Sequence, residues 1–494
     1  MNKIVSPQMK LDRSQLLYRQ IYETIRSWIL TGRYRAGERL PSTRSIASSL
    51  NVSRNTALLA YEQLIAEGYC SGSIGSGTYV NSSMEKSILI GGTPNAQRST
   101  ANSATPALSS YAKRVGVSHP FTASGSVRRP HFRYDFQYGL PGVGEFPHEV
   151  WQKLVSRRAR ASSMQSLRYG PAAGYLPLRQ VIADYLRRAR GVSCGPDEIV
   201  IVNGSQQALD LAARLLLDPN DDVIIEDPHY QGARQVFQAA GAKLIAAQVD
   251  EEGLNISGLP KSAESAKLVY VTPSHQFPTG GIMPAARRLA LLAWARKNNS
   301  YILEDDYDGE YRYEGWPVAA IQGLDQAERV LYVGTFSKSL FPSIRIGFLV
   351  IPKTLIKHFT AAKWLADRQT STLEQEVLTD FIQEGHFEKH LRRSRMKYAS
   401  RRKVLLQALE QALGNRVQIS GASAGVHLLV WIKNMSQAQL NKLIEGAAKE
   451  GVGLYSILPY YLNPPKNRAG LLFGYASLTE DAIRNGVRIF AKLV

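Results

Sequence analysis

The sequence contains few cysteines and no long apolar segment. Its two cysteines, Cys70 and Cys194, have no metal-ligand spacing around them. This scarcity argues against a disulfide framework and a zinc site, and it is typical of a reducing compartment. No segment approaches the roughly 20 apolar residues that span a bilayer, and the first residues, MNKIVSPQMKLDRS, have no apolar core like that of a secretory signal. We therefore expect a soluble, cytoplasmic protein.

Acidic residues are scarce relative to basic ones. The chain of 494 residues has 60 Lys and Arg against 41 Asp and Glu, a formal net charge of +19. Such an excess favours a polyanionic partner through charge attraction and counterion release, although a merely soluble basic protein fits the charge equally well. Hydrophobic residues make up 44% and charged residues only 20%, as in folded proteins. The length fits two or three domains.

The composition divides the chain into three parts. Residues 1–81 contain a compact block with helical periodicity and a Gly-rich end. Residues 82–133 are rich in Ser, Thr, Ala, Gly and Pro, lack sustained periodicity and are predicted to be a flexible linker. Residues 134–494 alternate short β-branched runs with amphipathic helical stretches. The runs EIVIVNG, DDVIIED, KLVYVTP, SYILEDD and RVLYVGTF are typical of a mostly parallel sheet that is buried on both faces.

The predicted linker is basic. It could follow DNA phosphates, although a solvated spacer is the more common use of such a segment. Its one acid, Glu85, stands against the basic residues Lys86, Arg98, Lys113, Arg114, Arg128, Arg129 and Arg133.

The first block has the pattern of a helix-turn-helix with a wing. Ser42 can cap the helix STRSIASSL, and Ser53 can cap SRNTALLAYEQLIAEG after a turn at Asn51 and Val52. In such a pair the second helix can lie in a major groove. The glycine-containing segment YCSGSIGSGTYV is predicted to form a hairpin. The apolar residues expected on the inner faces are Ile21, Ile25, Trp28, Ile29, Ile46, Ala47, Leu50, Ala57, Ala60, Tyr61 and Leu64.

The ordered series LPSTR, VSRNT, EGY and GSGTYV resembles the GntR family of bacterial winged-helix repressors over residues 15–80. Each feature taken alone would also suit a helical hairpin that merely packs. The resemblance implies DNA contacts from Arg44, Arg54 and Thr56, and positions near phosphates for Ser42 and Gly77. The predicted DNA-binding residues are Ser42, Arg44, Ser53, Arg54, Thr56 and Gly77.

The second block carries groups that suit pyridoxal 5′-phosphate (PLP). That chemistry needs a lysine for a Schiff base, a carboxylate for the ring nitrogen, donors for the phosphate and a flat group over the ring. GTFSKSLFPSIRIGFL offers Lys338 and Arg345, and SYILEDDYDGEY offers Asp305 and Tyr307. The helix start in NGSQQALDL suits a phosphate. The predicted cofactor residues are Lys338 as the catalytic lysine, Asp305 at the ring nitrogen, Tyr307 and His275 at the ring hydroxyl, Tyr230 on the ring, Ser205, Gln206 and Arg345 toward the phosphate, and Ser337 beside the lysine.

Two of these signals have ordinary alternatives. The acidic cluster of SYILEDDYDGEY could bind Mg²⁺, but no phosphate-binding P-loop accompanies it, and we expect no metal site. A lone histidine such as His275 is more often structural, so its assignment depends on its neighbours.

The order of motifs identifies the second block. YGPAAGYLPLR, NGSQQALDL, EDPHY, TPSHQFPTG, EDDYDGEY and FSKSLFPSIRIG follow one another as in fold-type I aminotransferases, a resemblance that covers residues 134–494. Joined to the winged helix, the chain resembles the MocR subgroup of GntR regulators. This resemblance implies an α/β fold with a large PLP-binding domain and a smaller C-terminal α/β domain. It also implies a head-to-tail homodimer in which each DNA-binding domain lies over the partner's PLP domain.

The sequence departs from the aminotransferase pattern in one place. Those enzymes usually have an arginine near the C-terminus that binds the substrate α-carboxylate, whereas PKNRAGLLFGYASL has none within the predicted strand. Arg468, just before the strand, is the nearest candidate, and the YQG segment at Tyr230 provides no cation. The departure argues against a simple amino acid as ligand and favours PLP itself as the signal.

Two functions follow from these patterns. The first is a DNA-binding transcriptional regulator that senses PLP, or an amine or amino acid held through PLP, and alters operator binding. The second is a functional aminotransferase with an appended DNA-binding-like domain. The series VSRNT and GSGTYV favours the regulator because an enzyme has no need for it.

Overall fold

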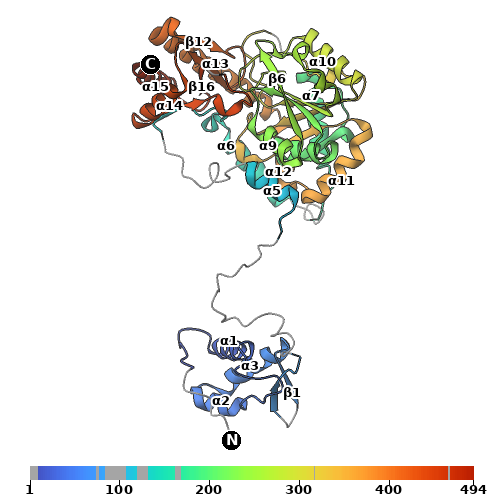
Figure 1. The fold of residues 1–494 in the computed structure, drawn as a ribbon, viewed down its shortest axis with the longest axis vertical. Coiled ribbons are helices and arrows are strands. Elements are labelled where there is room, and N and C mark those ends of the chain that lie inside the picture. Colours follow the sequence, from blue (N-terminus) through green and yellow to red (C-terminus); the bar gives the residue numbers. More distant parts are fainter. Residues whose placement is uncertain are drawn as a thin grey trace. The chain divides into compact units, whose positions relative to one another are not determined.

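The computed structural model describes residues 9–73, 77–83, 107–118, 132–161, 168–315, 318–465 and 468–494. The chain divides into two compact units, Met1–Ala107 and Leu108–Val494. We call them the N-terminal and C-terminal units and describe each by itself (Figure 1). No helix in these described ranges is both long and apolar enough to cross a membrane.

The N-terminal unit consists of three helices and a two-stranded antiparallel sheet. Ser42 Oγ accepts the Ser45 N–H at 3.1 Å, and Ser53 Oγ accepts the Thr56 N–H at 3.0 Å. Both serines therefore cap helices as predicted. Asn51 has φ 51° and forms the turn between the two helices. The elements are α1 (Leu17–Leu30), α2 (Thr43–Leu50), α3 (Arg54–Ala66), β1 (Cys70–Ser73) and β2 (Gly77–Val80).

A small apolar core holds this unit together. The predicted inner face of α3 is confirmed, with Ala57, Ala60, Tyr61 and Leu64 all buried. The Tyr61 hydroxyl donates to the Pro41 carbonyl at 2.7 Å and so fastens α3 to the segment before α2. Of the other predicted inward residues, Trp28 and Leu50 are only partly buried and pack against the core. The tip of the predicted hairpin, residues 74–76, lies outside the described residues.

The C-terminal unit is built on an eight-stranded sheet in the order β4-β11-β10-β9-β8-β5-β6-β7. Adjacent strands from β10 through β6 are parallel, whereas β11 and β7 run antiparallel to their neighbours. The five runs predicted as strands are confirmed as β4, β5, β8, β9 and β10. The strands are β4 (Ile199–Val202), β5 (Asp222–Asp227), β6 (Lys243–Asp250), β7 (Gly253–Leu254), β8 (Leu268–Val271), β9 (Tyr301–Asp306), β10 (Val330–Thr335) and β11 (Gly347–Val350).

Helices cover both faces of this sheet, which explains why its strands are continuous apolar runs. In β5, Val223 and Ile225 pack with one set of helices, while Ile224 between them packs on the opposite face. Helices α8, α9 and α11 cover the first face, and α7, α10 and α12 cover the other. Helix α6 (His148–Arg160) packs against α12. The covering helices are α7 (Leu176–Arg190), α8 (Ser205–Leu216), α9 (Gln231–Ala240), α10 (Ala285–Lys297), α11 (Ile356–Asp367) and α12 (Thr372–Gln383).

A smaller α/β layer follows near the C-terminus (Figure 1). Its antiparallel sheet has the order β12-β13-β16-β15. A short strand, β14, pairs in parallel with β3, and Gly453 lies opposite Asp135 in this pair. The elements are β3 (Tyr134–Asp135), α13 (His386–Leu413), β12 (Val417–Ser420), β13 (His427–Ile432), α14 (Gln437–Lys449), β14 (Val452–Gly453), β15 (Tyr455–Ser456), β16 (Ala469–Gly474) and α15 (Glu480–Leu493).

Part of the predicted linker is a helix. Residues Ser110–Ser118 form α5, which packs against α9. Arg114 Nε donates to the Ala239 carbonyl at 2.8 Å, at the last turn of α9. The sequence did not predict this helix, because nine residues are too few to form a stable helix alone and α5 depends on its docking against α9. The remaining linker residues 84–106 and 119–131, including Glu85, Lys86, Arg98, Arg128 and Arg129, lie outside the described residues.

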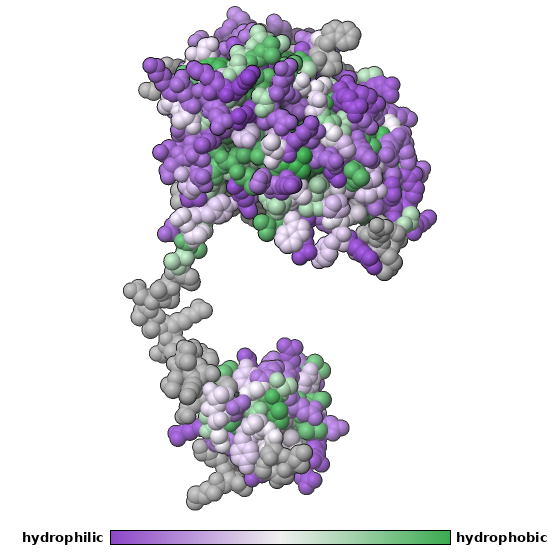
Figure 2. Space-filling model, turned by 90° about the vertical axis from the view of Figure 1, so that its right-hand side faces the viewer, coloured by the Kyte–Doolittle hydropathy of each residue, from purple (hydrophilic) through white to green (hydrophobic). Residues whose placement is uncertain are grey.

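Hydrophilic residues cover most of the surface on the face shown in Figure 2, with apolar residues in smaller patches. Exposed apolar side chains on α3 include Leu58 and Leu59. Scattered apolar residues of this kind are normal on folded proteins and identify no interface by themselves.

Candidate functional site

A cavity of ≈ 220 Å³ lies in the C-terminal unit beside the carboxyl ends of β8, β9 and β10. This is the position where open α/β sheets commonly bind ligands. Every predicted cofactor residue except His275 lines it. The lining residues are Tyr138, Gly139, Ser205, Gln206, Tyr230, Tyr270, Thr272, Phe277, Asp305, Tyr307, Thr335, Ser337, Lys338, Pro342 and Arg345.

Lys338 follows β10, and its amine lies in the cavity wall. Its Nζ donates to the Gly139 carbonyl at 2.6 Å. Burial lowers the pKa of Lys338, although Asp308 and Asp305 oppose the shift. A lowered pKa favours the neutral amine, which is the form that attacks an aldehyde.

Asp305 is a buried carboxylate with half of its hydrogen-bonding capacity unused. Oδ2 accepts the Tyr270 hydroxyl at 2.8 Å, whereas Oδ1 is buried and has no partner among the described residues. Burial raises the pKa of Asp305 to about 7. The protonated ring nitrogen of PLP would supply both the missing donor and the missing positive charge. The buried Ser337 Oγ, also without a described partner, is a further free polar group here. These residues fit PLP.

The start of α8 provides the anion-binding end of the cavity. Gly204 precedes the helix with φ 84°, and no side chain caps it. Arg345 Nη2 donates to the Asn203 carbonyl at 2.7 Å. A Cβ atom on Gly204 would lie only 2.8 Å from that Nη2 atom, so glycine permits the approach. Ser205 and Gln206, in the first turn, complete a site suited to a phosphate.

The structure places His275 behind Tyr307 rather than in the cavity wall. His275 Nδ1 lies 2.9 Å from the Tyr307 hydroxyl and 3.1 Å from Asp308 Oδ2. His275 therefore contacts Tyr307, the other residue predicted at the ring hydroxyl, and is not itself among the lining residues. Its direct contact with that hydroxyl stays a prediction.

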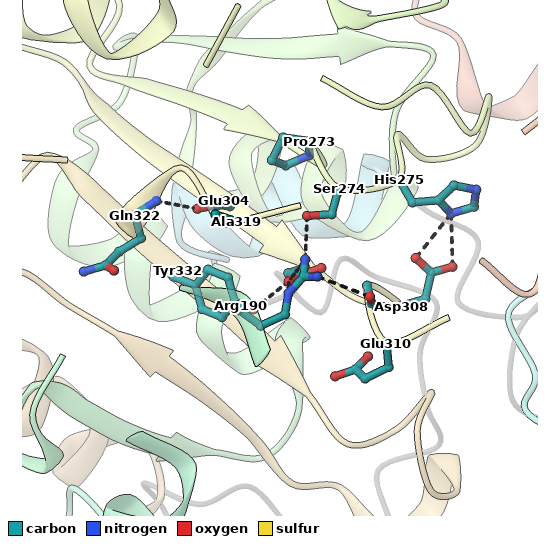
Figure 3. A network of polar contacts seen from close by, with 12 residues as sticks. Arg190, Pro273, Ser274, His275, Glu304, Asp308, Glu310, Ala319, Gln322 and Tyr332 are labelled. Atoms are coloured by element: carbon teal, nitrogen blue, oxygen red, sulfur yellow. Dashed lines mark hydrogen bonds and ion pairs between the residues drawn. The ribbon is translucent and has the colours of Figure 1, made fainter. Parts of the chain in front are cut away.

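A buried polar network supports the strand that carries Asp305 (Figure 3). Arg190 Nε donates to Asp306 Oδ2 at 2.6 Å, and its Nη2 donates to Ser274 Oγ at 2.7 Å. The Tyr332 hydroxyl also donates to Asp306 Oδ2, at 2.6 Å. Because Asp306 points to the opposite side of β9 from Asp305, one carboxylate is neutralised while its neighbour remains available in the cavity.

Three potential metal ligands meet within the described part of the chain. Side-chain atoms of His275, Asp308 and His427 lie within 4.8 Å of one another, and all three residues are buried. His275 Nδ1 already contacts both Asp308 oxygens and the Tyr307 hydroxyl. Burial lowers the pKa of His427 to about 4. These contacts place the three residues in the hydrogen-bonded layer behind Tyr307, and the absence of a metal here stays a prediction.

The predicted DNA-binding residues lie around α2 and α3. Arg44 and Arg54 are exposed, and no described residue forms a hydrogen bond or ion pair with either guanidinium. Ser42 and Ser53 use their hydroxyls as helix caps. Thr56 Oγ1 lies 2.8 Å from Ser53 Oγ. The two arginines, in the first turns of α2 and α3, therefore have guanidinium groups available to contact DNA.

Gly77, at the start of β2, has a packing reason of its own. It has φ 109°, and a Cβ atom there would lie 2.6 Å from Arg39 Nε. Arg39 also forms an antiparallel bridge with Tyr79. Glycine thus lets the exposed Arg39 cross the hairpin.

Several cavity residues were missed by sequence reasoning. Tyr138 and Gly139 follow the two-residue strand β3, a segment with no recognisable motif. Tyr270 and Thr272 lie at the end of β8, and Phe277 lies in the same TPSHQFPTG segment as His275. Tyr270, Thr272 and Phe277 could have been suggested by their position in or beside the motifs KLVYVTP and TPSHQFPTG. No local pattern indicated Tyr138 and Gly139.

Known proteins resemble both units. Residues 142–462 match the family described as aminotransferase class I and II, and residues 17–80 match the bacterial regulatory proteins of the gntR family. The chain is 38% identical over 477 residues to the probable rhizopine catabolism regulatory protein MocR of Rhizobium meliloti, covering 96% of this chain and 93% of that protein. It is 31% identical to the transcriptional regulator TauR of Rhodobacter capsulatus, with 96% of each chain covered.

Among solved structures, the kynurenine aminotransferase of Pyrococcus horikoshii is similar with a TM-score of 0.68 and 30% identity, covering 78% of this chain and 94% of that one. The helix-turn-helix unit, the aminotransferase-like unit and the near full-length match to regulators of the same fused architecture agree. The chain therefore belongs to the MocR-type transcriptional regulators of the GntR family, which join a DNA-binding helix-turn-helix to a PLP-binding, aminotransferase-like domain.

Proposed function

We propose that this PLP-dependent regulator changes its affinity for operator DNA when PLP, or an amine or amino acid held through PLP, occupies the cavity. The observation that carries the proposal is the unpartnered Asp305 Oδ1 in the same cavity as Lys338 and Arg345. A buried carboxylate oxygen that accepts no hydrogen bond is destabilising unless a ligand supplies the missing donor. The site is thus built for a bound cofactor.

Each cavity residue has a proposed role toward PLP, which supplies an aldehyde and an electron-withdrawing ring. Lys338 forms the covalent link through Nζ, and Asp305 holds the ring nitrogen protonated. Tyr307, steadied by His275, donates to the ring hydroxyl. Tyr230 covers the ring. The phosphate is held by Ser205, Gln206, Ser337 and Arg345 at the start of α8.

The N-terminal unit reads the operator in this proposal. Arg44, Arg54 and Thr56 contact DNA directly, and Gly77 allows the hairpin to approach the backbone. Ser42 and Gly77 lie near phosphates in this proposal, and Ser53, also predicted to bind DNA, fixes the start of α3 as its cap. We further propose a head-to-tail homodimer in the cytoplasm, which would present two such units to the operator.

A DNA-binding titration tests the proposal. The full-length protein, without and with PLP, is titrated on the DNA upstream of its own gene at one fixed salt concentration, because phosphate contacts make affinity salt-dependent. Ligand coupling of this kind is typically about 1–3 kcal/mol, or roughly 5- to 150-fold in affinity. A shift of that size on adding PLP identifies PLP as a signal. If amines and amino acids also leave the affinity unchanged, the proposal fails.

The alternative function, a working aminotransferase, makes a different prediction. Steady turnover of an amino donor and a keto acid by the purified protein would favour it. The cavity has the lysine and the ring-nitrogen carboxylate that such an enzyme needs, but β16, where aminotransferases carry their carboxylate-binding arginine, has the sequence AGLLFG. Ligand-dependent DNA binding without turnover supports the regulator.

A further inference from the structure

One wall of the cavity is aromatic. Tyr138, Tyr230, Phe277 and Tyr307 all line it. Their rings contact one another around Phe277, with centroid separations of 6.1 Å to Tyr138, 5.9 Å to Tyr230 and 5.7 Å to Tyr307. This wall continues into an apolar cluster whose buried members are Phe277, Leu429, Trp431, Ile457, Tyr460 and Leu472.

Positive charge in the cavity is limited to two residues. Among the described lining residues, Lys338 and Arg345 are the cations. The cofactor would use both, Lys338 for its aldehyde and Arg345 for its phosphate. No third cation faces the aromatic wall within the described residues of this chain.

Strand β16 explains why the third cation is missing. All six of its residues are buried and uncharged, and Leu472 belongs to the same apolar cluster as Phe277. Arg468, the candidate from the sequence, is not among the residues that line this cavity. Its guanidinium stacks on the Trp431 ring at 4.0 Å from the centroid, and it lines a different cavity with Asp227.

From these contacts we infer that the effector recognised beside the cofactor is a primary amine with an apolar or aromatic body and no carboxylate. This inference rests on the proposed function and names the ligand class of the same cavity. A carboxylate against this wall would lose its hydration without gaining a cation, which is strongly unfavourable. An apolar body gains from burial against the four rings.

Matched ligand pairs test the inference. The full-length protein loaded with PLP is titrated calorimetrically with 2-phenylethylamine against L-phenylalanine, and with 3-methylbutylamine against L-leucine. Each pair differs by one carboxylate. We expect the amine to bind at least about tenfold more tightly in both pairs, a difference of about 1.4 kcal/mol. Equal or tighter binding of either amino acid, or no binding of either amine, overturns the inference.

Two variants sharpen the test. Leu472→Arg places a guanidinium in the apolar cluster and should raise the affinity for L-leucine about tenfold relative to the volume-conserving control Leu472→Met. Arg468→Ala should leave the binding of both pairs unchanged, because Arg468 lies on Trp431. Loss of amino-acid binding in Arg468→Ala would show that this arginine serves the cavity and overturn the inference even if Leu472→Arg does not fold.

The failure of this inference differs from failure of the proposed function. Tight binding of amino acids with a ligand-dependent change in DNA affinity would retain the regulator and reject the amine class. Preferential binding of amines with DNA affinity unaffected by any ligand would retain the amine class and reject the regulatory proposal.

Discussion

Replacing Asp305 by asparagine should stabilise the cofactor-free protein while weakening PLP binding. Burial raises the pKa of Asp305 to about 7 from 3.8. At about 1.36 kcal/mol per pKa unit, ionising this group in the folded state above pH 7 costs about 4 kcal/mol. The folded state binds the proton more tightly than the unfolded chain does, so this group lowers the free energy of unfolding as pH rises from about 4 to about 7.

We expect Asp305→Asn to recover about 1–3 kcal/mol of that amount at pH 8, because the asparagine amide still needs hydrogen-bond partners. The assay is denaturant unfolding of the cofactor-free protein at pH 8 and pH 5. The gap between variant and wild type should narrow at pH 5, where Asp305 is already largely protonated in the folded state. PLP affinity should fall about 10- to 150-fold, since a charge-assisted hydrogen bond worth about 1.5–3 kcal/mol is lost.

Asp306→Asn is the matched control on the same strand. Asp306 pairs with the buried Arg190, with Nη2 and Oδ2 2.5 Å apart. Removing this charge leaves Arg190 buried without its partner, which typically destabilises by about 3–5 kcal/mol. Opposite effects of the two neighbouring substitutions at pH 8 would support the reasoning. A stability gap for Asp305→Asn that is independent of pH, or tighter PLP binding by this variant, would refute it.

Three further substitutions test separate parts of the proposal. Arg44→Ala should weaken operator binding by about 1–3 kcal/mol if Arg44 contacts a base. The control Arg19→Ala, which removes the exposed partner of Glu23 on α1, should leave operator affinity unchanged. Equal affinities for the wild type and both variants in a titration would remove Arg44 from the interface. Lys338→Ala should lose the visible absorbance of the bound cofactor and the effect of ligand on DNA binding, and a borohydride-reducible adduct on this variant would identify another lysine. Arg114→Ala should reduce the ligand-dependent change in DNA affinity without changing PLP affinity, because it detaches α5 from α9; an unchanged response would show that α5 is not involved.

Local patterns in the sequence were sufficient to predict most elements of the fold. The caps at Ser42 and Ser53 and the buried runs of β5 and β9 depend on a few adjacent residues, so their structure follows from local chemistry. Helix α5 could not be predicted in this way, because it is short and polar and depends on docking against α9.

Sequence reasoning predicted only those residues of the candidate site that lie within recognisable motifs. Lys338 lies in the loop after β10 and Asp305 lies at the end of β9, both within recognisable motifs, and both line the cavity. Their partners come from elsewhere in the chain: Lys338 donates to Gly139, 199 residues away. Likewise, His275 faces Tyr307 instead of the cavity because of side-chain directions that no sequence spacing specifies.

Helix α9 links the cavity to α5, the helix that follows the linker from the DNA-binding unit in the sequence. Tyr230 lines the cavity and is also the N-cap residue of α9. At the other end of that helix, the Ala239 carbonyl accepts a hydrogen bond from the Arg114 guanidinium of α5. A cation there stabilises the last turn of a helix through its free carbonyls and dipole. Helix α9 therefore connects a residue that lines the cavity with the docking site of α5. Suppose that α9 has two positions and that α5 docks in only one of them. A ligand with different affinities for these two positions would then shift the docking equilibrium of α5 by the difference in its binding free energies. Any regulatory coupling requires such a difference.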